Sequence, residues 1–315
     1  MPDIKKCLPW AHCPGAREYW TLGATIGRKA MILDCHTHIF PTEMIRDRDA
    51  LCGKDKGFAA IYKNAKARMV GVEDLISSMD DSGIGRSVIC GFSWSRADLC
   101  SHHNQYLFES AGRYPKRLMV FISFSSSDPE RSLLELEKGI KAGAKGVGEI
   151  AFYHCEMGPQ DLEGMRPALT VMEAKRIPLL LHTHETIGHT YPGKGETPLS
   201  RFYELILAHP RLRIVLAHWG GGLPFYELMP EVKKTMTQVY YDTAASPFLY
   251  SPRIYSIASE IVGSDRILFG SDYPLISPKR YFKELGESAL SEDDRKRILG
   301  LNLMKLLELE DRETH

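Results

Sequence analysis

Short apolar segments recur along most of this 315-residue chain, and stretches with helical periodicity separate them. Alternation of β-like and α-like segments favours a parallel sheet, because parallel neighbours need a long crossover connection between them. We count eight such segments. The expected strands cover residues 31–36, 86–92, 118–124, 146–151, 178–182, 213–218, 239–242 and 267–271.

Eight strands alternating with helices are the content of a closed (β/α)8 barrel, which needs about 250 residues. We therefore predict an α/β fold, a single TIM-barrel domain over residues 31–315. An open, doubly wound parallel sheet is the alternative. Residues 1–30 precede the first strand and contain Trp10, so we expect them to form an N-terminal extension packed on the barrel.

Local signals support the helices between the strands. A helix over residues 73–81 is followed by Gly83, a residue suited to a C-cap, and Asp128 and Ser291 are expected N-caps of two later helices. Two connections, residues 40–70 and 185–198, are long for this kind of barrel. Both follow strands, on the face where such barrels place their functional sites, so we expect them near the site.

The charge balance excludes some classes of partner. Lys plus Arg and Asp plus Glu each number 40, which argues against a nucleic-acid binder. No run approaches the roughly 18 apolar residues needed to span a membrane, and no secretory signal is expected. The seven scattered cysteines are typical of a reducing compartment. We expect a cytoplasmic enzyme with a small-molecule substrate, and self-association into a homo-oligomer stays open.

Candidate metal ligands stand where the expected strands end. In Asp34-Cys35-His36-Thr37-His38 the two histidines are two residues apart, so on a strand both imidazoles point the same way. Four further candidates each end a later strand: Glu149, His182, His218 and Asp272. Because the carboxyl ends of barrel strands meet at one rim, we expect these side chains to form one cluster.

Imidazole and carboxylate ligands suit a divalent metal ion. Zinc is the leading choice, while manganese and iron(II) are alternatives, and the number of ions is one or two. Such an ion lowers the pKa of bound water from about 15.7 toward 7 and polarises carbonyl groups. Without a cation, burying these groups together would be costly.

A set of ordered motifs resembles a known enzyme family. The motifs are Asp34-Cys35-His36-Thr37-His38, Leu181-His182, Ala217-His218-Trp219-Gly220-Gly221-Gly222, Phe269-Gly270-Ser271-Asp272-Tyr273-Pro274 and Ile298-Leu299-Gly300-Leu301-Asn302. Together they resemble the amidohydrolase superfamily, and more narrowly its amidohydrolase-related branch, which includes aminocarboxymuconate-semialdehyde decarboxylase. The resemblance extends from residue 31 to about residue 308.

This resemblance implies roles for the candidate residues. His36, His38, His182 and Asp272 would hold or approach the metal, and His218 would bind a second ion or polarise substrate and water. Members of the family with two metals often bridge them through a carbamylated lysine on the fourth strand.

Two residues of the fourth strand compete for that bridging position. Lys145 shares the expected inward parity of Glu149 but lies four residues deeper, about 13 Å down the strand, too far to bridge ions at the rim. Glu149 resembles the arrangement in the TatD nuclease family, so we favour it as a ligand. A hydrogen bond from a metal-bound water is the alternative.

The expected chemistry is hydrolysis of a C–N or C–O bond in a small polar amide, lactone or ester. Asp272 would take a proton from the metal-activated water and return it to the leaving group, and His218 would stabilise the oxyanion. Metal-dependent decarboxylation of a small carboxylic acid is the main alternative, because relatives use the same ligand set for it. A catalytically inactive metal-binding barrel is the alternative from another class.

Polar and aromatic residues outside the expected cluster are further candidates for function. Candidate substrate-binding residues follow the second and fifth strands: Trp94, Arg96, His184, His189 and Lys194, with Arg46 and Arg48 from the first long connection. We expect Cys35 to face the helices. Surface or helix-end positions are expected for His102, His103, His154 and His209.

Overall fold

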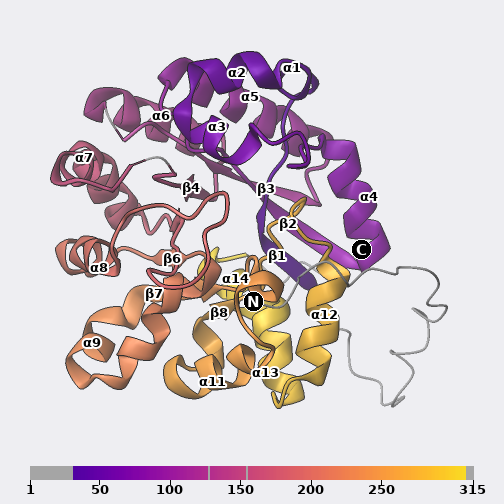
Figure 1. Cartoon of the computed structure of the whole chain (residues 1–315), viewed down its shortest axis with the longest axis vertical. Helices are drawn as coiled ribbons and strands as arrows, with labels where there is room; N and C mark the ends of the chain where they lie inside the picture. The colour runs from indigo at the N-terminus through magenta and orange to yellow at the C-terminus, as the bar shows by residue number, and fades with distance from the viewer. Residues whose placement is uncertain (1–30, 127, 154, 310–315) are drawn as a thin grey trace, which may run out of the picture. The chain divides into compact units, whose positions relative to one another are not determined.

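The computed structural model describes residues 31–126, 128–153 and 155–309. Within these ranges, eight parallel strands follow one another in sequence order, and helices surround them (Figure 1). The predicted (β/α)8 barrel is confirmed. The expected extension over residues 1–30 and the assignment of His154 lie outside the described residues and stay predictions. Among the described residues no helix is long and apolar enough to cross a membrane.

Each predicted strand overlaps an observed one. The strands are β1 Ile32–Thr37, β2 Ile84–Cys90, β3 Leu118–Ile122, β4 Gly146–Ile150, β5 Leu179–Leu181, β6 Ile214–Leu216, β7 Val239–Asp242 and β8 Ile267–Leu268. Strands β5, β6 and β8 end earlier than predicted. His182 and Asp272 therefore lie on loops beyond their strands at the carboxyl rim, and His218 is the first residue of the 3-10 helix η1 His218–Leu228.

The helices of the outer layer are α4 Val72–Ser82, α5 Ala97–Arg113, α6 Pro129–Lys141, α7 Pro159–Lys175, α8 Leu199–Ala208, α9 Pro230–Thr235, α10 Ser246–Leu249, α11 Arg253–Val262, α12 Pro278–Glu287 and α13 Glu292–Lys296. The last helix is α14 Asn302–Leu306. Two predicted N-caps are confirmed, because the side chains of Asp128 and Ser291 accept hydrogen bonds from backbone N–H groups three residues later. Gly83 ends α4 with φ +69°, a conformation that glycine adopts without a side-chain clash.

Side chains from the two sides of the strands form separate apolar clusters. The inner cluster combines residues of the strands, such as Val88 and Phe121, with Leu303 and Leu306 of α14. Arg213, which precedes β6, donates to the carbonyl of Leu306 at 2.8 Å. Helix α14 therefore closes the end of the barrel where the strands begin and leaves the carboxyl rim for the site.

Backbone hydrogen bonds join the last strand to the first at the carboxyl rim. The N–H of Cys35 donates to the carbonyl of Phe269 at 2.8 Å, and the N–H of Asp272 donates to the carbonyl of His36 at 2.9 Å. The N–H of His38 donates to the carbonyl of Tyr273 at 2.8 Å. This closure brings Asp272 beside the histidine pair, although 234 or more residues separate them in sequence.

The connection after β1 is more ordered than a long loop. It contains three short helices, α1 Thr42–Arg46, α2 Arg48–Lys54 and α3 Lys56–Tyr62. Their apolar side chains pack with residues that follow β2 in an aromatic cluster, which includes Phe40, Phe58 and Phe92. The short helices inside this long connection were not predicted. They form because these aromatic rings bury one another.

His103 lies at the base of this aromatic cluster and is fully buried, so the surface prediction for it is wrong. Its Nδ1 accepts hydrogen bonds from the N–H of Phe92 at 3.3 Å and from Nε1 of Trp94 at 3.2 Å. Its Nε2 donates to the carbonyl of Ile39 at 2.8 Å. A neutral imidazole thereby satisfies three groups that would otherwise lack partners.

Candidate metal centre

Three of the predicted ligands meet where the first and last strands close the barrel. Nε2 of His36 and Nε2 of His38 are 3.0 Å apart. Oδ1 of Asp272 lies 3.8 Å from the first nitrogen and 3.5 Å from the second. The three donor atoms lie within 4.8 Å of one another, close enough for one ion to bind all of them.

The other three predicted ligands form a second triad beside the first. Nδ1 of His182 lies 2.8 Å from Oε1 of Glu149 and 3.1 Å from Nε2 of His218. Nε2 of His218 is 3.5 Å from the same carboxylate oxygen. The structure therefore brings all six predicted metal and catalytic residues into one cluster.

The carboxylate of Glu149 faces both triads. Its Oε2 lies 3.6 Å from Nε2 of His36 and 3.6 Å from Nε2 of His38, while its Oε1 faces His182 and His218. This arrangement can hold one ion between the triads or bridge two ions. Lys145 is exposed and takes no part, so its exclusion as a bridging residue stands.

Two residues of the cluster adopt left-handed backbone conformations, which are uncommon for residues with a Cβ. The φ angles are +56° at His218 and +55° at Asp272. The N–H of His218 donates to Oδ1 of Asp242 at 2.8 Å, and the N–H of Asp272 donates to the carbonyl of His36. These hydrogen bonds hold the turns that aim both side chains across the rim.

Three of the four imidazoles donate their outer N–H to a fixed acceptor. Nδ1 of His36 donates to Oδ2 of Asp242 at 2.7 Å, and Nδ1 of His218 donates to the carbonyl of Ala244 at 3.1 Å. Nε2 of His182 donates to the carbonyl of Gly193 at 2.8 Å. In each neutral ring the other nitrogen then offers its lone pair to the cluster, as metal-binding histidines require.

Sequence reasoning missed Asp242, although the prediction ended the seventh strand at this residue. A carboxylate at a strand end is the same signal that pointed to Glu149 and Asp272. The fully buried side chain of Asp242 does not face the cluster. It accepts hydrogen bonds from Nδ1 of His36 and from the backbone N–H of His218 instead. Sequence pattern alone does not separate such a supporting carboxylate from a ligand.

Burial and neighbouring charges shift the pKa values of the cluster residues, and for His36, Glu149 and His218 they act in opposite directions. Burial disfavours the imidazolium of His36, but the negative charges of Glu149 and Asp242 outweigh this and raise its pKa well above the usual value. Burial would raise the pKa of Glu149, but His36 and His182 hold it well below its usual range. For His218, burial is outweighed by Glu149 and Asp272, and its pKa rises to about 9. Burial and the charge of His36 lower the pKa of His38.

The donor set fits a divalent cation. The carboxylates favour positive charge in this buried site, and in the metal-free protein protons on the imidazoles supply such charge. The Nδ1–H of His36 donates a hydrogen bond to Asp242, and Nε2 of the same ring lies 3.0 Å from Nε2 of His38. Two nitrogen lone pairs at this distance repel unless a proton or a cation lies between them. A metal ion would replace those protons, in line with the release of protons on metal binding.

Aromatic side chains adjoin the cluster. The hydroxyl of Tyr153 donates to Oε2 of Glu149 at 3.1 Å, and its ring stacks on Phe92 with centroids 5.6 Å apart. The Tyr153 ring also meets His182 edge to face at 4.8 Å. Tyr62, from the end of α3, is buried, and its pKa is raised by burial and by the charges of Asp272 and Glu149. Sequence reasoning missed both tyrosines, because neither stands at a strand end.

Two predicted substrate-binding residues lie away from the metal ligands. Trp94 is 1% exposed and stacks on Phe58 within the aromatic cluster, where its Nε1 donates to His103. Arg96 is on the surface, and its guanidinium pairs with Asp98. Packing occupies the first side chain and a neighbouring carboxylate the second, so we no longer assign either to substrate binding.

The predicted residues after β5 divide into two groups. His184 is 4% exposed, and its ring lies 6.3 Å from that of His182. Its Nδ1 has no hydrogen-bond partner among the residues that the structure describes. It stays a candidate for substrate contact. Lys194 donates to the carbonyls of Ile187 and His189 at 3.1 Å and 3.2 Å. The ammonium of Lys194 therefore organises its own loop, and the exposed His189 does not join the cluster.

Irregular pairing changes which way some strand residues point. The β1–β2 register shifts between Asp34 and Thr37, and Cys35 packs in the inner cluster. The expectation that Cys35 faces the helices is therefore wrong. A second shift, between Val147 and Ile150, lets Glu149 point inward although Val147 packs outward. The inward parity expected for Lys145 is wrong for the same reason.

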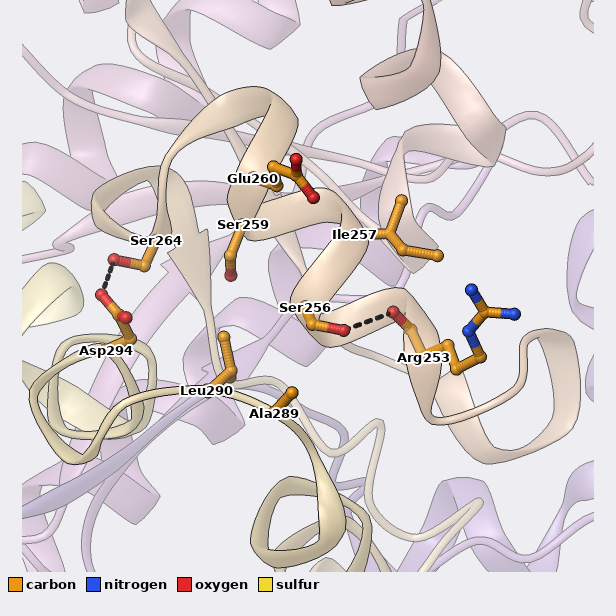
Figure 2. A pocket seen from close by; sticks show the side chains of 9 residues that line it. All are labelled: Arg253, Ser256, Ile257, Ser259, Glu260, Ser264, Ala289, Leu290 and Asp294. Carbon is orange, nitrogen blue, oxygen red and sulfur yellow. Dashed lines mark hydrogen bonds between the residues drawn. The ribbon is translucent and has the colours of Figure 1, made fainter.

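A hollow of about 550 Å³ lies elsewhere, among helices of the outer layer (Figure 2). It is lined by residues of α11, by Ser264 before β8, by the α12–α13 connection and by Asp294 of α13, and none of them belongs to the metal cluster. Ser264 donates to Asp294 across one side of it. Its lining offers no set of metal ligands, so the candidate site remains at the carboxyl rim.

This chain is similar in sequence or in fold to several known proteins. γ-Resorcylate decarboxylase of Rhizobium radiobacter is 24% identical over 261 residues, 68% of this chain and 77% of that protein. The crystal structure of 5-carboxyvanillate decarboxylase from Sphingomonas paucimobilis has a TM-score of 0.71 at 15% identity, over 90% of this chain and 100% of the other. The dihydroxybenzoic acid decarboxylase of Polaromonas sp. JS666, with bound manganese and 2-nitroresorcinol, has a TM-score of 0.66 at 18% identity, over 90% and 98%. The amidohydrolase family model matches residues 33–309, and this chain therefore belongs to the amidohydrolase family.

Proposed function

We propose that this protein is a metal-dependent decarboxylase of a small aromatic carboxylic acid. The relatives named above are decarboxylases, and they support the decarboxylase alternative over the hydrolase expected from the sequence. The observation that carries the proposal is the six-residue cluster of imidazoles and carboxylates, with the Tyr153 hydroxyl hydrogen-bonded to it and aromatic rings stacked beside it. Aromatic rings next to a metal centre suit a flat, negatively charged substrate.

The metal would be held by residues of both triads. His36, His38 and Asp272 offer one set of donor atoms, and Glu149, His182 and His218 offer the other. A bound divalent cation would supply positive charge to hold and polarise the oxygens of the acid. Manganese is our first choice, because structural neighbours bind it, and the same ligands accept zinc. Whether one ion or two bind depends on Glu149.

The reaction replaces a carboxylate by a proton. The bond between the ring and the carboxyl carbon breaks, carbon dioxide leaves, and the ring carbon gains a proton. We assign the delivery of that proton to Asp272, whose side chain is 14% exposed and thus the most accessible of the six. We assign His218 to holding negative charge on the substrate, because Asp242 and Ala244 fix its orientation at the rim. His184 completes the proposed substrate contacts.

The test is a paired assay on the intact protein loaded with Mn²⁺ and, separately, with Zn²⁺. One arm measures carbon dioxide release from a panel of hydroxylated benzoic acids, with unsubstituted benzoate as the comparison. The other arm measures hydrolysis of lactones and amides of similar size. Carbon dioxide release that EDTA abolishes supports the proposal, while metal-dependent hydrolysis without carbon dioxide release contradicts it. A cytoplasmic location and a homo-oligomeric state stay predictions.

A further inference from the structure

Access to the metal cluster is restricted in this structure. Five of the six candidate ligands are between 0% and 8% exposed, and the Asp272 side chain is 14% exposed. A small aromatic acid that reacts there has to reach these groups. A part of the structure therefore has to move away from them, and the segment after β5 is placed to do so.

This segment, residues 185–197, we call the flap. At Gly193 it lies over the cluster, where its carbonyl accepts the 2.8 Å hydrogen bond from Nε2 of His182. A Cβ at Gly193 would lie 3.2 Å from Cδ1 of Ile61 in α3 and 4.0 Å from the ring of Tyr153. The flap thus meets the α1–α3 connection and the turn after β4 beside the metal ligands.

The flap holds its own shape. Lys194 donates to the carbonyls of Ile187 and His189, and its ammonium lies 5.7 Å from the centre of the Tyr191 ring. The hydroxyl of Tyr191 donates to Glu185 at 2.7 Å, at the start of the flap. These internal bonds hold the flap together, as in compact surface loops.

We propose that the flap is a lid and that Gly193 is a positioning residue, whose carbonyl fixes His182 for metal binding only when the lid is closed. A proton on Nε2 leaves the lone pair of Nδ1 free, and this nitrogen faces Glu149 and His218. When the flap opens, Nε2 loses its acceptor and the ring loses a contact that sets its orientation. The proposal rests on the metal site of the proposed function.

Metal binding and closure of the flap stabilise each other by thermodynamic linkage. A metal ion on Nδ1 requires the proton of His182 to reside on Nε2, and that proton is the one Gly193 accepts. Metal binding therefore favours the closed flap, and the closed flap raises the affinity for metal by the same factor. Substrate entry then requires the flap to open against this coupling, and the lid closes again around the bound acid.

A matched pair of glycine substitutions tests the positioning role. Gly193→Ala adds a methyl group that meets Ile61, at a residue with φ +95°. Gly188→Ala adds the same group in the same flap, at φ +108°, where only Nζ of Lys194 lies nearby at 3.8 Å. Both carry similar backbone strain, so the control removes that contribution. Titration of the metal-free proteins with Mn²⁺ should show affinity about 10-fold to 100-fold weaker for Gly193→Ala and near wild type for Gly188→Ala.

Hydrogen exchange in the wild-type protein provides a second test that needs no variant. The N–H of Lys194 donates to the carbonyl of Tyr191 inside the flap at 3.1 Å. Adding Mn²⁺ to the metal-free protein should slow exchange of flap amides by about fivefold or more, with no comparable change in α8. Should Gly193→Ala fail to fold by circular dichroism, this experiment decides alone.

The outcomes separate this inference from the proposed function. Equal Mn²⁺ affinity in the two variants overturns the positioning role, and flap exchange that does not respond to Mn²⁺ overturns the coupling. Mn²⁺-dependent protection of the flap without carbon dioxide release supports the lid and contradicts the decarboxylase. Carbon dioxide release together with flap exchange that does not respond to Mn²⁺ supports the decarboxylase and contradicts the lid.

Discussion

Acidification should weaken this fold through one buried histidine, His103. Its Nδ1 already accepts hydrogen bonds from Phe92 and Trp94, so a proton there would break both and bury a charge. Burial therefore lowers the pKa of His103 from 6.5 to about 4. In the unfolded chain the imidazole is in water and takes up a proton near its ordinary pKa.

The sign and size of the effect follow from this difference. Because the folded pKa is the lower one, the unfolded chain binds more protons in acid, and stability is lost as the pH falls from about 6.5 to about 4. The difference between a pKa of 6.5 and a pKa of about 4 corresponds to about 3 kcal/mol of unfolding free energy at the acid limit. Between about pH 7 and pH 5 the loss should be about 2 kcal/mol.

The assay compares unfolding by urea at several pH values for wild type, His103→Gln and His102→Gln. His103→Gln should be less stable at neutral pH, because one or more buried partners lose their hydrogen bond, at about 1–3 kcal/mol. It should lack the loss of about 2 kcal/mol on acidification. His102, the next residue of α5, is half exposed and pairs with Glu43, so its variant should follow the wild type. Equal changes in unfolding free energy with pH for wild type and His103→Gln would show that His103 does not cause the acid sensitivity.

Three further predictions concern the metal centre. Asp272→Asn should keep most of the bound Mn²⁺, measured by elemental analysis, and should lose about 100-fold or more of the rate of carbon dioxide release, because it removes the proton donor; an active variant would contradict that role. Asp242→Asn should weaken Mn²⁺ binding about 10-fold to 100-fold in a titration, because His36 loses the carboxylate that fixes its proton, and unchanged affinity would refute this. Removal of metal by EDTA should abolish turnover and Mn²⁺ should restore it; turnover in the metal-free protein would exclude the metal-dependent reaction.

The barrel could be predicted from the sequence because the patterns that indicate its strands lie within short segments. Each strand is a short apolar run, and the ligands stand where these runs end, so Glu149, His182 and Asp272 could be placed on one rim before their distances were known. The order inside the first long connection was not readable. Its short helices form because aromatic rings from separate segments, such as Phe40 and Phe92, pack together.

The rest of the site depends on contacts that sequence order does not encode. Register shifts in β1 and β4 break the alternation of side chains, which is why the directions of Cys35 and Lys145 were predicted wrongly. Supporting groups such as Asp242, Tyr153 and the Gly193 carbonyl act on ligands far away in the chain. Their roles follow only from their three-dimensional positions.

Decarboxylation in D₂O distinguishes the proposed decarboxylase from a hydrolase. The Mn²⁺-loaded protein is given an ortho-hydroxylated benzoic acid whose carboxyl carbon is ¹³C, and both products are followed by NMR. We expect labelled carbon dioxide together with an equal amount of the phenol, which carries one deuterium at the carbon that lost the carboxylate. A panel of such acids that leaves the label in the carboxyl group, while lactones or amides are hydrolysed, would contradict it.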